Sequence, residues 1–94
     1  MGGVSPLAPT AARVRISGRV LTSDGSGLRN ATVLIRDSTG GVHSCITTAF
    51  GYYSFDSIEI GNYLVSVSSK SFKYETRPLN VNDAIADLDF VPIH

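Results

Sequence analysis

The chain has 94 residues, 43% of them hydrophobic, and its eight basic and eight acidic residues cancel to a formal net charge of zero. This length is enough for one domain and too short for two. The balanced charge lacks the electrostatic footprint of a nucleic-acid-binding protein, and no apolar run is long enough to span a bilayer. We therefore expect no nucleic-acid partner and no membrane insertion.

The first twelve residues, MGGVSPLAPTAA, are mostly small, contain two prolines and have no hydrophobic periodicity. They lack the positive stretch and long apolar stretch of a secretory signal. We expect residues 1–12 to be a flexible linker, or a segment added when the domain was excised from a longer protein. Residues 13–94 then form the domain.

Apolar and polar residues alternate from Arg13 onward, with the period of two that is typical of half-buried strands. Asp24-Gly25 and the STGG stretch supply turn signals between the first runs. This pattern predicts strands over residues 13–21, 31–37 and 42–48.

The second half of the chain continues in the same way as far as residue 69. The pattern predicts strands over 51–55 and 63–69, with a short loop around Gly61 between them. Residues 70–83 are less regular, and Pro78 makes their middle an edge strand or a loop. A last strand is expected over 86–93, with Leu88 and Phe90 on one face.

Six or seven short strands in about eighty residues, with no helical pattern, predict an all-β sandwich. The alternation gives each sheet one core face and one solvated face, as antiparallel sheets allow.

The stretch TTAFGYYSF, residues 47–55, is the most aromatic part of the chain. Its rings either form a binding platform or are buried where the chain turns. We predict a turn at Gly51, because glycine adopts backbone conformations that side chains resist. Tyr53 and Phe55 then point inward and meet Tyr63 from the neighbouring strand, whereas Tyr52 points outward.

The stretches ISGRVL, TTAFGYYSF and SIEIGNYLVSV together resemble the carboxypeptidase regulatory-like domain, over about Val14 to Phe90. The resemblance implies a transthyretin-like (prealbumin-like) fold, a seven-stranded Greek-key β-sandwich. It also implies a non-catalytic module, found mostly in large extracytoplasmic bacterial proteins or attached to carboxypeptidases. We expect the core to contain Ile16, Gly18, Val20, Val33, Ile35, Gly51, Tyr53, Phe55, Tyr63, Val65, Val67 and Phe90.

Residues with metal-binding chemistry are few. His43 and Cys45 lie two apart on one predicted strand, but a structural zinc site needs four ligands and the only other histidine is His94. The oxygen-bearing residues between Asn80 and Asp89 lack the spacing of an EF-hand. We expect no metal and no cofactor.

Catalytic motifs are also lacking, since no G-x-S-x-G stretch occurs and no histidine is in a readable relation to an acid. We therefore predict that the chain is not an enzyme. A related adhesin sandwich family carries an isopeptide bond from a lysine in its first strand. Here the only lysines are Lys70 and Lys73, so we expect no such cross-link.

The leading expectation is a structural or interaction module of a larger extracytoplasmic protein, which spaces, stabilises or binds neighbouring domains and is monomeric when isolated. Arg13, Arg15 and Arg19 share one strand face, which is either a solvated face or a docking surface for an acidic neighbour. One alternative is an accessory domain of a peptidase. The other is a carbohydrate-binding module that uses exposed rings, the candidates being Phe50, Tyr52, Phe72 and Tyr74.

Overall fold

The computed structural model describes residues 13–93, and the linker expected over residues 1–12 lies outside this range, as does His94. The described residues contain strands and no helix. The strands are β1 (Arg13–Arg19), β2 (Thr32–Asp37), β3 (Val42–Ile46), β4 (Tyr52–Glu59), β5 (Gly61–Ser68) and β6 (Arg77–Val81).

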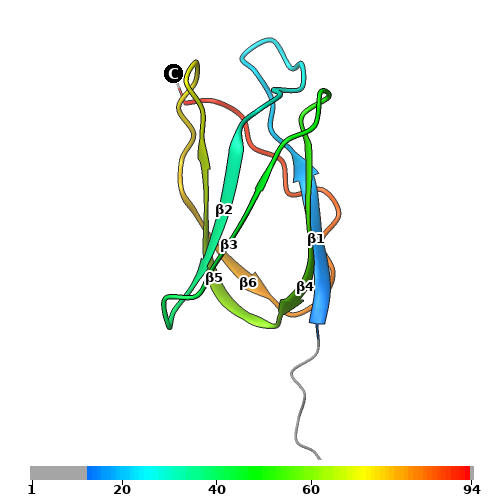
Figure 1. Cartoon of the computed structure of the whole chain (residues 1–94), viewed down its shortest axis with the longest axis vertical. Coiled ribbons are helices and arrows are strands. Elements are labelled where there is room, and N and C mark those ends of the chain that lie inside the picture. Colours follow the sequence, from blue (N-terminus) through cyan, green and yellow to red (C-terminus); the bar gives the residue numbers. More distant parts are fainter. Residues whose placement is uncertain (1–12, 94) are drawn as a thin grey trace, which may run out of the picture.

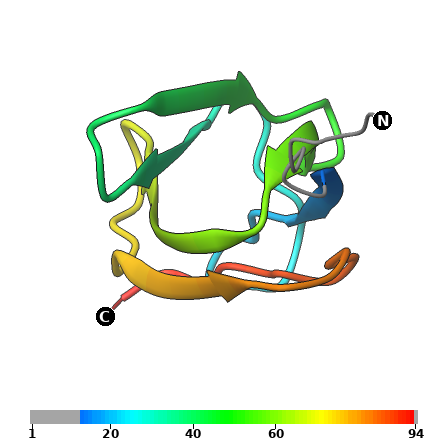
Figure 2. The ribbon, with the colours of Figure 1, turned by 90° about the horizontal axis from the view of Figure 1, so that it is seen from below.

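The strands form two sheets that face each other across the core (Figures 1 and 2). β1 pairs with β4 in the smaller sheet, and the larger sheet has the order β3-β2-β5-β6, with every ladder antiparallel. The chain passes from one sheet to the other after β1, β3, β4 and β6. The all-β sandwich predicted from the sequence is therefore confirmed.

The expected seventh strand is not regular, so the prediction of seven strands is wrong and the described residues form six. The segment from Ile85 to Phe90 does run beside β1, in parallel, through isolated bridges at both of its ends. Five backbone hydrogen bonds of 2.8–3.1 Å join it to residues 15–21. It completes the smaller sheet without becoming a uniform strand.

This segment is irregular because one of its carbonyl groups, that of Leu88, does not accept a hydrogen bond from β1. The Leu88 carbonyl oxygen accepts a 2.5 Å hydrogen bond from the Tyr53 hydroxyl, across the sheet from β4. It comes so close to Gly18 that a Cβ there would lie 2.0 Å from it. The Arg19 amide instead donates to the carboxylate of Asp89, 3.0 Å away. A side-chain oxygen thus satisfies a backbone donor where the ladder slips.

β4 continues to Glu59, beyond the residue at which the alternation predicted a loop. A β-bulge explains the difference, since Ile16 pairs with Phe55 but Val14 pairs with Ile58. Residues 56 and 57 of β4 lie opposite the single residue Arg15 of β1, and Ser57 has a positive φ of 61°. The bulge shifts the phase of alternation, so that Phe55 and Ile58 both point inward although they are three residues apart.

The core lies between the two sheets. The structure buries ten of the twelve residues expected there and leaves Tyr63 and Val67 half-buried against them. Tyr63 does not come from a strand next to β4, because β5 lies in the other sheet between β2 and β6, and the rings that pack on Tyr53 are Phe55 and Phe90. Five further residues are buried in the core although they were not in the expected set: Ala31, Ile58, Tyr74, Val81 and Leu88.

The aromatic stretch is a turn with buried rings. Gly51 has a φ of 82°, and a Cβ there would lie 2.6 Å from the Val20 carbonyl oxygen. The Tyr53 ring packs edge-on against Phe55, with ring centroids 6.0 Å apart, and tilted against Phe90 at 6.3 Å. Such buried aromatic pairs add about 0.5–1.5 kcal/mol to the free energy of unfolding beyond area burial.

Thr47 anchors this turn to the larger sheet, and the sequence did not single it out. Its hydroxyl is buried, accepts from the Ala31 amide at 3.0 Å and donates to the Leu28 carbonyl at 2.6 Å. Both backbone groups precede β2, so one side chain fixes the entry to that strand. Buried backbone groups need such partners when no ladder supplies them.

Candidate functional site

The best candidate site is a groove of about 650 Å³ on the outer face of the smaller sheet. We call it the arginine–tyrosine groove. It lies over β1, the start of β4, the end of β3 and the C-terminal segment. Its charged, hydroxyl-bearing and aromatic lining residues are Arg15, Ser17, Arg19, Thr48, Tyr52, Tyr53, Ser54, Asp87 and Asp89.

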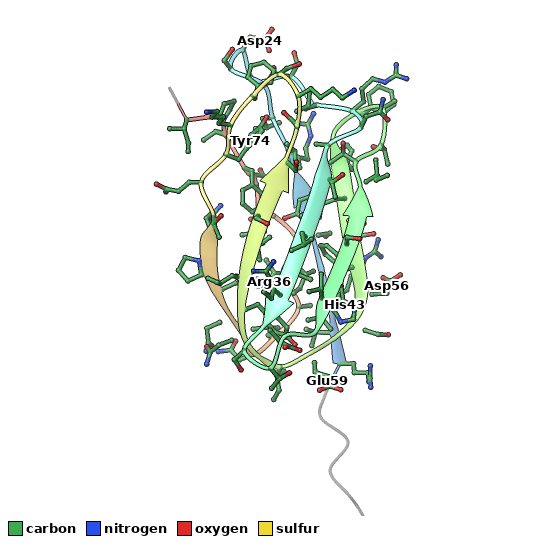
Figure 3. The ribbon with its side chains drawn as sticks, turned by 60° about the vertical axis from the view of Figure 1, so that its left-hand side comes forward. Asp24, Arg36, His43, Asp56, Glu59 and Tyr74 are labelled. Carbon is green, nitrogen blue, oxygen red and sulfur yellow. The ribbon has the colours of Figure 1, made fainter. Side chains whose placement is uncertain are left out.

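The alternation of β1 places its arginines on this face, as the sequence predicted, but each has an acidic group nearby. Arg13 forms an ion pair of 3.2 Å with Glu59, and Arg15 lies 3.6 Å from Asp56 on the bulged part of β4. Figure 3 shows Glu59 at the lower end of the molecule, and Asp56 further up the same side. The face therefore has mixed charge, and the pairs are too exposed to add more than about 1 kcal/mol each.

Arg19 has the most defined position of the three. Its guanidinium stacks over the Tyr52 ring, with the central carbon 4.8 Å from the ring centroid, and donates to the Phe50 carbonyl at 3.2 Å. Its Nε is buried and has no hydrogen-bond partner within the described part of the chain. The groove thus contains a fixed cation, a flat ring and an unused donor.

The four rings proposed as a ligand surface do not lie together. Phe50 and Tyr52 are exposed at 72% and 53%, at the edge of the groove. Tyr74 is not an exposed ring, because it is buried and its hydroxyl donates to the Leu21 carbonyl. Figure 3 shows Tyr74 in the loop segment after β5. Phe72 is half-buried against the core, so only Phe50 and Tyr52 still fit that surface.

The remaining candidate ligands of the sequence are dispersed. β3 holds an exposed His43 and a half-buried Cys45. Burial raises the pKa of the Cys45 thiol, which makes it a weaker nucleophile at neutral pH. Asn80 donates its amide to Asn62 at 2.6 Å, while Asp89 accepts from a backbone amide. Within residues 13–93, no three His, Cys, Asp or Glu side chains lie close enough together to hold a metal ion.

A second hollow, of about 540 Å³, lies over β5 and β6 on the larger sheet. Its apolar lining comes from Tyr63, Leu64, Pro78 and Leu79, and its charged residues are Arg36 and Asp37. Figure 3 shows Arg36 pointing outward from β2. The one aromatic ring in this lining, Tyr63, is half-buried, and the lining has no buried side-chain nitrogen or oxygen without a partner within residues 13–93.

No helix among residues 13–93 is long and apolar enough to cross a membrane.

Comparisons with protein families and with solved structures relate the chain to known proteins. The family model for the carboxypeptidase regulatory-like domain matches residues 15–91. No curated protein matches the chain in sequence.

Two solved structures share the fold at low sequence identity. One is the TIE protein of Bacillus anthracis, with a TM-score of 0.66 and 14% identity over 86% of this chain. The other is the pilus 2b backbone protein of group B streptococcus, with a TM-score of 0.64 and 12% identity over 85% of this chain. The chain corresponds to only 17% of the first protein and 41% of the second.

Proposed function

The chain belongs to the carboxypeptidase regulatory-like domain family, and we propose that it is a non-catalytic structural module that spaces or stabilises neighbouring domains of a longer protein. The proposal rests on family membership together with the path of the chain through the sandwich. We further propose that the isolated domain is a monomer.

One observation carries the spacer role: the chain enters and leaves the sandwich at opposite ends. β1 begins at the lower end in Figure 1, and the described chain leaves at the upper end. A domain whose termini lie close together can be inserted into a loop of another domain, but it adds little to the end-to-end length of a row of domains. Termini at opposite ends suit a module that extends a row of domains.

The chemistry of the described side chains supports a non-catalytic role. The one thiol, Cys45, is half-buried with a raised pKa. His43, two residues along the same strand, is exposed and hydrogen-bonded to no acid in the described chain. Nucleophilic catalysis needs a base in contact with the nucleophile and a third group that orients the base.

We propose an extracytoplasmic location, because one of the two structural neighbours named above is the backbone protein of a bacterial pilus. The likeness at 12–14% identity concerns the fold, so this location is an analogy.

Small-angle X-ray scattering tests the spacer role. We would compare the single domain with a tandem of two copies, after light scattering has established that both are monomeric. A rigid spacer predicts that the longest dimension of the tandem is close to twice that of one copy. A tandem that folds back on itself, with a dimension near that of one copy, would contradict the proposal.

A second candidate function is carbohydrate binding at the arginine–tyrosine groove. The stacked Arg19 and Tyr52, the exposed Phe50 and the nearby Asp87 and Asp89 provide what a sugar requires, namely a flat apolar surface beside hydrogen-bonding groups. The absence of tryptophan weakens this candidate.

A glycan array decides between the two functions. A saturable sugar signal that is lost in Tyr52→Ala but kept in Leu64→Ala would support binding at the groove. Leu64 is the matched control, since it is similarly exposed but lies on the other sheet. An array without any signal would leave the spacer as the better account.

A further inference from the structure

The first strand and the last segment of the domain lie side by side and run in the same direction. We call this pair, β1 with residues 85–90, the terminal clamp. Ile85 bonds to Arg15 and Ser17 at one end of it, at 3.0 and 2.8 Å. Phe90 bonds to Arg19 and Leu21 at the other end, both at 2.9 Å.

The direction of these strands decides how the clamp responds to tension. A force applied through the chain ends pulls β1 from its lower end and the C-terminal segment from its upper end. The two strands are then displaced along each other, and the hydrogen bonds between them are loaded together. An antiparallel pair held at adjacent ends would instead open one bond at a time.

Side chains add to the clamp at its irregular centre. Asp89 accepts from the Arg19 amide at 3.0 Å, and the Leu88 carbonyl accepts from Tyr53 of β4. Arg77 of β6 donates to the Asp89 carbonyl at 2.7 Å and stacks over Phe90 at 5.2 Å. The C-terminal segment is therefore held to both sheets.

From this geometry we infer that the domain bears mechanical load, with the terminal clamp as the element that must rupture before the sandwich unfolds. The inference rests on the proposed spacer role, because tension reaches the clamp only through neighbouring domains. It assigns a function to residues 85–90, which do not form a regular strand.

Single-molecule force spectroscopy tests the inference through the direction of pulling. In one geometry the domain is held through its two ends, between marker domains. In the other it is held through its N-terminal end and a cysteine in Asn82→Cys, in a Cys45→Ser background. Residue 82 follows Val81, which pairs with Gly61 next to the end of β4, and β4 ends opposite Arg13. This second geometry therefore pulls both clamp strands from the same end.

We expect the unfolding force to be several-fold higher through the chain ends than through residue 82. The same Cys45→Ser, Asn82→Cys chain is pulled in both geometries, so its thermodynamic stability is the same in the two and a difference in force reports the direction of loading. Equal forces in the two geometries would overturn the inference.

Two substitutions of Asp89 test whether the terminal clamp provides the resistance to mechanical unfolding. Asp89→Ala removes the acceptor for the Arg19 amide and should lower the end-to-end unfolding force, whereas Asp89→Asn keeps an oxygen there and should restore it. Asp56→Ala is the matched control, since Asp56 lies on the same sheet face but outside the clamp. An Asp89→Ala force equal to that of the parent would count against the clamp.

These results are separable from the test of the spacer role. A compact tandem that still unfolds at high force would refute the rigid spacer and leave the clamp intact. An extended tandem with equal forces in both pulling geometries would do the reverse.

Discussion

Gly18→Ala is the most informative single change, because it places one methyl group against the backbone of the C-terminal segment. The new Cβ would lie 2.0 Å from the Leu88 carbonyl oxygen and 2.5 Å from its carbon. Since Cβ atoms stay more than 3 Å from backbone atoms, Leu88 must move by about 1 Å or more. An antiparallel ladder with β4 holds β1 on its other side, so the C-terminal segment is the part that moves.

The cost follows from the bonds that Leu88 makes. Its carbonyl holds the buried Tyr53 hydroxyl, and its amide donates to the Ser17 carbonyl at 3.1 Å. Losing two hydrogen bonds costs about 1 kcal/mol each, and a buried hydroxyl without a partner costs about 1–3 kcal/mol more. Alanine restricts the unfolded chain, which returns about 0.4–1 kcal/mol. We expect a net loss of about 2–4 kcal/mol in the free energy of unfolding.

Gly25→Ala is the matched control. Gly25 has a φ of 89°, but nothing lies within 4 Å of the Cβ position. Only backbone strain remains, at about 1–2 kcal/mol. Urea denaturation followed by circular dichroism measures both variants. The reasoning would be refuted if Gly18→Ala were no less stable than Gly25→Ala.

Three further predictions concern other parts of the structure. Thr47→Val should lower the free energy of unfolding by about 2–4 kcal/mol, because it leaves the buried Ala31 amide and the half-buried Leu28 carbonyl without partners, while Thr47→Ser should restore most of it in the same urea assay. Burial and the negative charge of Asp89 raise the pKa of Tyr53 above its usual 10.0. The folded state keeps the Tyr53 proton at a pH where the unfolded state loses it, so the stabilising effect is complete below pH 10 and is lost above it. Between pH 10 and 12 the free energy of unfolding should therefore fall less steeply for Tyr53→Phe than for the parent protein. Parallel curves of stability against pH for the two proteins would contradict this prediction. Phe50→Ser should change the melting temperature by less than 2 °C, since the ring is 72% exposed; a larger drop would mean that it packs on the domain.

The alternation in the sequence was sufficient to predict β2 and β5. Buried Val33 and Ile35 are two residues apart in β2, and in β5 the buried Val65 lies two residues from each of the half-buried Tyr63 and Val67. It failed where the period of two breaks. The bulge at Ser57 shifts β4 by one residue, and no residue type announces a bulge of this kind.

The site was harder to predict than the fold. The sequence indicated that Arg13, Arg15 and Arg19 share a face, but it gave no information on which acids lie opposite, because that depends on the register between strands. Tyr74 was misjudged for a related reason. It lies outside any strand, so no alternation indicates which way its ring points, and only the tertiary fold buries it.

The pairing of β1 with residues 85–90 also sets the order in which the domain can fold. Ser17 and Ile85 are bonded but lie 68 positions apart in the chain, so this contact closes a loop of almost the whole domain. A chain that emerges from the ribosome or crosses a membrane with its N-terminus first leaves one side of β1 unpaired until the last residues arrive. The sandwich should therefore complete in one late and slow step, as expected for folds rich in distant contacts.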